Sequence, residues 1–149
     1  MAQTYSAEID IDAPPEAVWA VLVDFAAYPS WNPFTREVRC TGVPGDMVKM
    51  KVDLGWSGVR KQAERLVEFG YPRIVWVMDV GADPVIGASR TQTVTPRPGG
   101  CTYRTDDHIF GAVSPVVDLL FGRVLNAGFA ALAKSLREEV LRRQAASAA

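Results

Sequence analysis

The stretch SPVVDLLFGRVLNAGFAALAKSLREEV, residues 114–140, decides the fold of this chain. Ser114 and Pro115 form a helix cap and first-turn signal. Apolar residues then recur at helical spacing and mark one face. They are Val117, Leu120, Val124, Leu125, Phe129, Leu132, Leu136 and Val140. A helix of this length needs an apolar partner along its whole length, and only a sheet elsewhere in the chain can supply one.

The segments before this helix read as strands. Residues 4–11 alternate apolar and polar side chains, which is the two-residue period of a strand with one wet face. A proline-led segment at about 14–25 has helical spacing. Six alternating segments separated by short turns follow, at about 35–41, 46–54, 60–69, 73–80, 87–95 and 101–110. This order predicts an α+β fold in which a seven-stranded curved antiparallel sheet wraps around the long C-terminal helix, with short helices after the first strand.

The length and charge of the chain exclude several classes of protein. A chain of 149 residues with 48% apolar content is expected to form one domain with a real core, in which only the tail 144–149 frays. The net charge of −1 gives no electrostatic footprint for nucleic acid or an anionic membrane. No signal peptide and no stretch of about 18 apolar residues is evident. We therefore expect a cytoplasmic protein without stable membrane insertion.

The chain shows no motif for a metal or a nucleotide. Cys40 and Cys101 lie far apart in apparent strands, so two reduced and mostly buried thiols are expected. His108 is the only histidine, and one histidine without cysteine or a second histidine nearby makes no credible transition-metal site. No phosphate-binding glycine motif occurs. We expect neither a metal nor a cofactor.

The connection YPSWNPF, residues 28–34, which we call the corner, contains three aromatic residues and two prolines. Proline restricts its own backbone and that of the residue before it, so Tyr28 and Asn32 are predicted to be extended within a rigid bend. Two alternatives remain for the aromatic side chains. They form a packed corner without ligand contact, or Trp31 and Phe34 form the aromatic wall of a pocket mouth. In either case Tyr28 or Asn32 offers a polar atom.

Two stretches carry a resemblance to a known family. IDIDAPPEAVWAVLVDFAAYPSWNPF at 9–34 and FGAVSPVVDLLFGRVLNAGFAALAKSLREEV at 110–140 resemble the first helices, the Trp-Asn-Pro corner and the final helix of the START-like (SRPBCC) superfamily, with its polyketide cyclase/dehydrase and lipid-transport branches. The resemblance implies a helix-grip fold, in which a cavity between the sheet and the long helix holds hydrophobic or aromatic molecules. Members include aromatase/cyclases and carriers of lipids or hormones.

The lining of such a cavity follows from strand parity. Successive side chains of a strand point to opposite faces, so one inward residue fixes the face of all the others. The apolar sets of the 46–54 and 73–79 segments are therefore expected to face inward, opposite the apolar face of the helix. Together with Phe34 they supply the expected apolar lining, which comprises Met50, Trp76, Met78, Leu125 and Phe129.

Two parities are open for the last two strands. Val94 and Phe110 each precede a turn or helix that should pack on the core, and taking both as inward is the parity that we favour. It turns inward Arg90, Gln92, Arg104, Asp106, His108 and Phe110. The opposite parity turns inward Thr91, Thr93, Tyr103, Thr105 and Ile109. The favoured parity predicts an apolar pocket with a cationic end.

On the favoured parity, Asp106 and His108 share one face, and a carboxylate beside the imidazole would raise the pKa of His108 and fix its tautomer. Buried charges must pair with one another or with a ligand. The set is therefore either an ion-pair network that closes one end of the barrel or a functional site.

Three functions are compatible with this sequence. The favoured hypothesis is binding or transport of a hydrophobic, cyclic or aromatic molecule, lipid-like or polyketide-like, in the cavity between the sheet and the helix. The second is a polyketide aromatase/cyclase or dehydratase with His108 and Asp106 as acid and base. The third is a protein-interaction module with a collapsed cavity.

Overall fold

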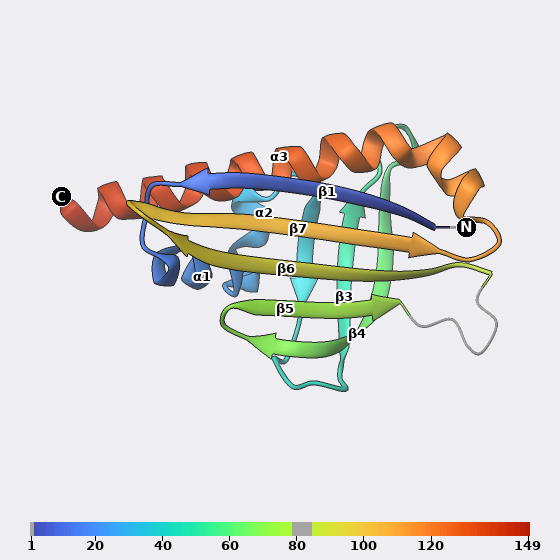
Figure 1. Ribbon diagram of the computed structural model, residues 1–149, viewed down its shortest axis with the longest axis horizontal. Coiled ribbons are helices and arrows are strands. Elements are labelled where there is room, and N and C mark those ends of the chain that lie inside the picture. Colours follow the sequence, from blue (N-terminus) through green and yellow to red (C-terminus); the bar gives the residue numbers. More distant parts are fainter. Residues whose placement is uncertain (1, 79–84) are drawn as a thin grey trace.

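One curved antiparallel sheet and one long helix make up most of the structure. The computed structural model describes residues 2–78 and 85–149, and the last two residues of the 73–80 segment lie outside the described residues. Seven strands are hydrogen-bonded in the order β1-β7-β6-β5-β4-β3-β2 (Figure 1). They are β1 (Ala2–Ile11), β2 (Thr35–Arg39), β3 (Met47–Asp53), β4 (Val59–Gly70), β5 (Arg73–Met78), β6 (Gly87–Arg97) and β7 (Gly100–Phe110). The predicted meander is confirmed, and the first strand is added at its edge by pairing with the last.

The C-terminal helix α3 (Ser114–Ala148) runs along β1 on one side of the sheet (Figure 1). Four side chains on the predicted face, Leu125, Phe129, Leu132 and Leu136, are buried against the sheet, which confirms the single continuous helix. Near the start of the helix the predicted apolar face turns partly away from the sheet, and Leu120 there is 50% exposed. The structure therefore has the helix-grip fold that the sequence predicts.

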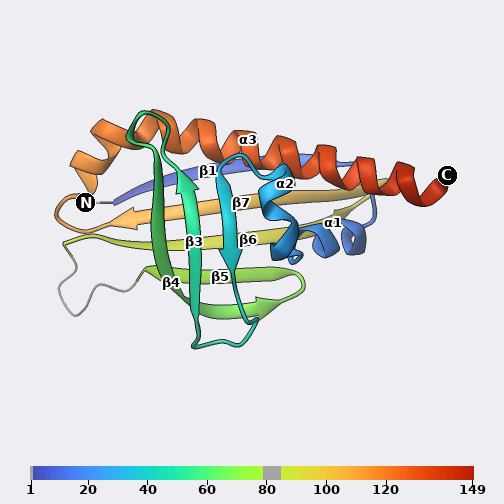
Figure 2. The same cartoon turned by 180° about the vertical axis from the view of Figure 1, so that it is seen from behind.

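The sheet curls strongly around α3. Seen from behind, β2, β3 and β4 cross in front of the long strands β6 and β7, and their upper ends lie near α3 (Figure 2). A bulge lies between Leu66 and Glu68 where β4 meets β5, and a second lies between Thr35 and Glu37 where β2 meets β3. Bulges bend a strand and increase its twist. The inner face is thereby concave, and it faces α3.

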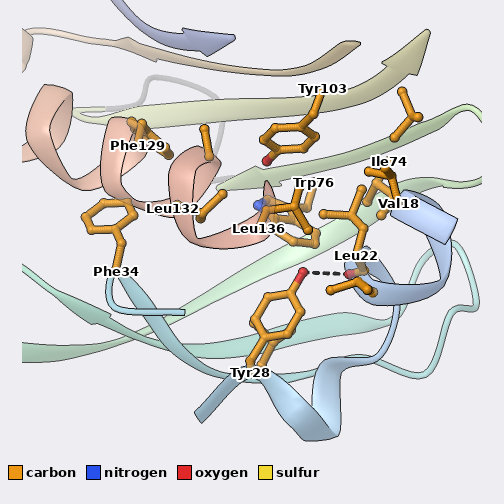
Figure 3. Packing of buried hydrophobic residues seen from close by; sticks show 14 of the residues in the cluster. Val18, Leu22, Tyr28, Phe34, Ile74, Trp76, Tyr103, Phe129, Leu132 and Leu136 are labelled. Carbon is orange, nitrogen blue, oxygen red and sulfur yellow. Dashed lines mark hydrogen bonds between the residues drawn. The ribbon is translucent and has the colours of Figure 1, made fainter. Parts of the chain in front are cut away.

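Three short helical segments follow β1 and carry the aromatic corner: α1 (Pro15–Leu22), η1 (Phe25–Ala27) and α2 (Tyr28–Trp31). The Tyr28 hydroxyl donates a hydrogen bond of 2.6 Å to the Leu22 carbonyl (Figure 3). Asn32 is extended as predicted, but Tyr28 is helical, with φ −53° and ψ −41°. The expectation for Tyr28 was wrong because the proline bias is modest, and this residue's buried ring and hydroxyl contact hold it in the last helical turn.

Asn32 ends the corner. Its side-chain Oδ1 accepts hydrogen bonds from the backbone N–H groups of Phe34 at 3.1 Å and Thr35 at 2.8 Å. An asparagine that hydrogen-bonds the backbone two or three residues on mimics a turn. These bonds turn the chain into β2 and direct the Phe34 ring onto Phe129, with ring centroids 4.9 Å apart (Figure 3).

Helix α3 extends further than its buried face requires. It continues through Ala148, and residues 144–149 are all exposed, so their fraying stays a prediction. By length and composition alone, α3 is also long and apolar enough to cross a membrane, a feature that was not predicted from the sequence. One such helix is weak evidence, because helices that pack on a protein core meet the same criterion. The cytoplasmic location stays a prediction.

Candidate ligand-binding cavity

A cavity of about 210 Å³ lies between the concave face of the sheet and α3. Most of its lining is apolar: Phe34, Met50, Val52, Leu54, Trp76, Met78, Ile86, Ala88, Ile109, Val117, Phe121, Leu125 and Phe129. Five polar side chains also line it: Thr35, Gln62, Glu64, Arg90 and Asp107. The arrangement is a concave apolar surface with a few polar groups, which is typical of small-molecule sites.

The structure brings half of the expected site residues into this lining. Those that line the cavity are Phe34, Met50, Trp76, Met78, Arg90, Leu125 and Phe129. Trp31 and Asn32 belong instead to the packed corner, where the Trp31 ring lies 4.9 Å from that of Tyr28. Gln92 is buried behind the lining, and its Oε1 accepts hydrogen bonds from the Tyr103 hydroxyl at 2.7 Å and from Arg90 at 3.3 Å.

The favoured parity was right for β6 and wrong for β7. Arg104, Asp106, His108 and Phe110 point away from α3, on the outer face of the sheet. Arg104 pairs there with Asp106 at 2.8 Å and with Glu8 at 3.1 Å. The Nδ1 of His108 lies 3.0 Å from the Thr4 hydroxyl. These charges are stabilised by neighbours and by water on an uncovered face, so the acid–base pair expected of Asp106 and His108 has no access to the cavity.

The register with β1 explains this parity. Ala7 is opposite Thr105, and Glu8 is opposite Arg104. Residues directly opposite in an antiparallel pair point to the same face. The charged residues of β7 therefore lie on the same outer face of the sheet as the acidic residues of β1 that they are paired with. The pairing of the first strand with the last, combined with this Glu–Arg complementarity, is the signal that could have identified the parity.

Arg90 lies at the centre of a row of side chains on the inner face. Register places it opposite Trp76 on β5 and opposite Asp107 on β7, and Asp107 is in turn opposite Tyr5 on β1. The Arg90 guanidinium carbon lies 5.5 Å from the centre of the Trp76 ring and 4.9 Å from that of Phe129. Its Nε donates a hydrogen bond of 3.1 Å to the Thr105 hydroxyl. Two aromatic faces and a hydroxyl thus hold this buried cation in place.

Two carboxyl groups share the cavity with Arg90. Burial raises the pKa of Glu64 from its ordinary 4.5 to about 7, with a smaller contribution from the charge of Asp107. Burial also raises the pKa of Asp107 from 3.8 to about 6. Arg90 opposes both increases. Both carboxyl groups therefore hold or release a proton near neutral pH.

Neither Glu64 nor Asp107 is among the site residues predicted from the sequence. Asp107 shares its face with Tyr103 and Ile109, which is the parity that was not favoured. Glu64 lies two residues before the buried Leu66 on β4, a strand whose parity was left unassigned. The period of two from Leu66 would have turned Glu64 inward.

No metal centre is evident in the part of the chain that the structure describes, because no three His, Cys, Asp or Glu side chains there are grouped to hold an ion. The expectation that the protein uses no metal stays a prediction. The polar part of the cavity lining consists of one guanidinium, two carboxyl groups, an amide and a hydroxyl.

A curved sheet that grips a helix over an internal cavity defines the helix-grip class of folds. Residues 2–147 match the model of the family described as polyketide cyclase / dehydrase and lipid transport, so the chain belongs to this family. No curated protein sequence matches the chain. The predicted resemblance to the START-like superfamily is confirmed.

Solved structures share this fold at low sequence identity. The Zhui aromatase/cyclase of a Streptomyces species is 16% identical, with a TM-score of 0.77 over 96% of each chain. A START superfamily protein from Mycobacterium smegmatis is 18% identical, with a TM-score of 0.68 over 93% of this chain and 97% of that one. Norcoclaurine synthase from Thalictrum flavum, solved with dopamine and hydroxybenzaldehyde, is 17% identical, with a TM-score of 0.69 over 95% of this chain and 88% of that one. These likenesses show the fold.

Proposed function

We propose that this protein binds a small, largely apolar ring compound in the cavity between the sheet and α3. The observation that carries the proposal is the 210 Å³ cavity itself, with its aromatic and aliphatic walls. An apolar cavity of about 150 Å³ is enough to take up benzene. The present cavity therefore has room for a substituted ring or a compact pair of rings. The alternative of a protein-interaction module assumed a collapsed cavity and does not match this volume.

Family membership supports the same proposal, because the family is described by cyclisation and by lipid transport. Both activities require that an apolar molecule be held out of water. The cavity walls also suit a flat ligand. Phe34, Trp76, Phe121 and Phe129 present aromatic surface from the corner, the sheet and the helix. Aromatic pairs stabilise each other beyond simple burial of area.

Filling the cavity tests this proposal. Ala88 lies on β6 with 5% of its surface exposed and contributes to the lining, so Ala88→Phe should occupy the space that a ligand would use. We expect naphthalene to bind the wild-type protein in a fluorescence titration and to lose at least tenfold in affinity for Ala88→Phe. Ala63→Phe is the matched control, because Ala63 is exposed on the outer face of β4. Absence of binding to the wild type, or equal binding to Ala88→Phe in its folded form, would contradict the proposal.

An enzyme of the cyclase or dehydratase kind is the second candidate. His108 and Asp106 lie outside the cavity and cannot support it, but Glu64 and Asp107 line the cavity and titrate near neutral pH. Such values suit general acid–base catalysis. A catalytic role predicts that Glu64→Gln loses turnover of a bound poly-β-ketone while its affinity is retained, whereas a carrier has no turnover to lose.

A further inference from the structure

Glu64 occupies an unusual place for a carboxyl group. It lies in the interior of β4, opposite Val48 on β3, and two residues from Leu66, both of which are essentially fully buried. Only 6% of its own surface is exposed, and its Oε2 has no hydrogen-bond partner among the described residues. A buried carboxyl oxygen without a partner is costly, so its position in the cavity wall calls for an explanation.

Two more buried polar atoms of the lining lack a hydrogen-bond partner in the described part of the chain. Within the described ranges, Thr35 Oγ1 and Trp76 Nε1 have no hydrogen-bond partner, and each residue is 1% exposed. Together with Glu64 Oε2 they include an indole donor, a carboxyl oxygen and a hydroxyl. They come from β2, β4 and β5, and all three residues line the cavity. A ligand with a polar substituent can satisfy hydrogen-bonding groups that the fold leaves unused.

The charges of the cavity favour an uncharged ligand. Near neutral pH, Asp107 is mostly ionised and offsets the positive charge of Arg90, while a large share of Glu64 retains its proton. The polar lining is then close to electrical neutrality. A ligand carboxylate or ammonium would add a charge to a space of low dielectric, and that charge would need a counter-charge of its own.

We propose that Glu64 is the polar anchor of the cavity and selects an uncharged ring compound that carries a hydroxyl group, such as a phenol or a cyclic alcohol. This inference rests on the proposed function. A hydroxyl both donates and accepts hydrogen bonds. It can therefore pair with Glu64 in either protonation state, donating to the carboxylate or accepting from the carboxylic acid. An ammonium can only donate, and a carboxylate can only accept. The apolar walls hold the ring while Glu64 orients it.

Four naphthalene probes of the same ring system test this inference at pH 7. They are naphthalene, 2-naphthol, 2-naphthoate and 2-naphthylmethylammonium. We expect 2-naphthol to bind the wild-type protein about tenfold more tightly than naphthalene, the range that one hydrogen bond supplies, and more tightly than either charged probe. Tightest binding of the carboxylate would identify an anion site at Arg90, and tightest binding of the ammonium would identify a cation site. Either result would overturn the hydroxyl assignment.

Three variants separate Glu64 from the rest of the cavity. In Glu64→Leu the ratio of naphthalene to 2-naphthol dissociation constants should fall to about one, because the anchor is lost. In Glu64→Gln most of the ratio should remain, because an amide also donates and accepts. Glu68→Gln, an exposed change on the same strand, should leave the ratio unchanged. Since the ratio compares two ligands of one variant, changes in cavity size largely cancel.

The possible results distinguish the two proposals. If no probe binds the folded wild-type protein, the proposed ligand-binding function fails. If naphthalene binds but 2-naphthol has no advantage, the cavity binds ligands and Glu64 is not an anchor. If the advantage survives in Glu64→Leu, another group such as Thr35 or Trp76 receives the hydroxyl, and the assignment to Glu64 is wrong.

Discussion

At the scale of the residue, the site depends on one cation and two carboxyl groups that the fold removes from water. Arg90 is stabilised by aromatic faces and by two polar neighbours, so its charge is well supported. Glu64 has no comparable support, and burial is the main reason why its pKa rises. The folded protein therefore binds a proton at Glu64 more tightly than the unfolded chain does. This difference makes stability depend on pH.

The sign of that dependence follows from linkage. Below pH 4.5 Glu64 is protonated in both the folded and the unfolded protein and has no destabilising effect. Between about 4.5 and 7 the unfolded chain releases the proton while the folded protein retains it, so stability falls as pH rises. Above pH 7 both forms are ionised and the loss is complete. A shift of this size corresponds to about 3 kcal/mol in the free energy of unfolding.

Glu64→Gln should remove this contribution, because glutamine has no proton to release. We expect the variant to gain stability relative to the wild type as pH rises from 4.5 to 7, by about 3 kcal/mol in total, and then to keep a constant difference. Urea unfolding of both proteins at pH 4.5, 6, 7 and 8 measures it, with Glu68→Gln as the exposed control. A difference independent of pH would show that Glu64 is solvated or paired in the folded protein.

At the scale of the element, α3 depends on a glycine where it meets the corner. A Cβ at position 128 would overlap the Phe34 ring, which also packs on Phe129. Glycine weakens a helix interior by about 1 kcal/mol relative to alanine. Close approach of the corner to the helix is the reason to keep it. The sequence marks Gly128 as a weak point of the helix, and only the structure shows the neighbouring ring.

Gly128→Ala should therefore destabilise the protein despite its better helix propensity. The ring of Phe34 is held between the helix and the corner and cannot move aside freely, so overpacking should cost about 1–3 kcal/mol in the free energy of unfolding. Chemical denaturation measures this change. In a Phe34→Leu background the same substitution should be close to neutral or stabilising, because the clash is gone. Stabilisation in the wild-type background would show that the helix is not in close contact with the ring.

Two elements show how far the sequence could predict the structure. The apolar face of α3 is defined by eight residues at helical spacing. Rotating the helix by one residue about its axis would expose most of them, so the buried face could be predicted from the sequence. Strand β7 carries polar residues on both faces, so its own pattern does not distinguish inside from outside. Its parity is set by the partner strand β1, which is about a hundred residues away in the sequence. Long-range pairing of this kind is not visible in a local period.

At the scale of the whole molecule, the cavity exists because the sheet is too curved to pack on α3 along its whole width. The apolar lining could be predicted from period two and the helix face, whereas the polar lining depends on how β4, β6 and β7 align. The sheet supplies Trp76 and Arg90, and the helix supplies Leu125 and Phe129. A ligand bound in this cavity would contact both layers at once. Separation of the two layers during unfolding would therefore release it.

A ligand that contacts both layers should stabilise the whole fold. Binding to the folded protein alone adds RT ln(1 + [L]/Kd), about 2.7 kcal/mol at a ligand concentration of 100 times Kd. For a domain of this size, that amount should raise the melting temperature by roughly 5–10 °C. We expect 2-naphthol to shift the melting temperature in calorimetry, and Ala88→Phe to show no shift because its cavity is filled. An equal shift in Ala88→Phe would place the binding site elsewhere on the surface. No shift in the wild type at saturating 2-naphthol would mean that the ligand binds the unfolded chain as well, and would remove the link between the cavity and the closed arrangement of sheet and helix.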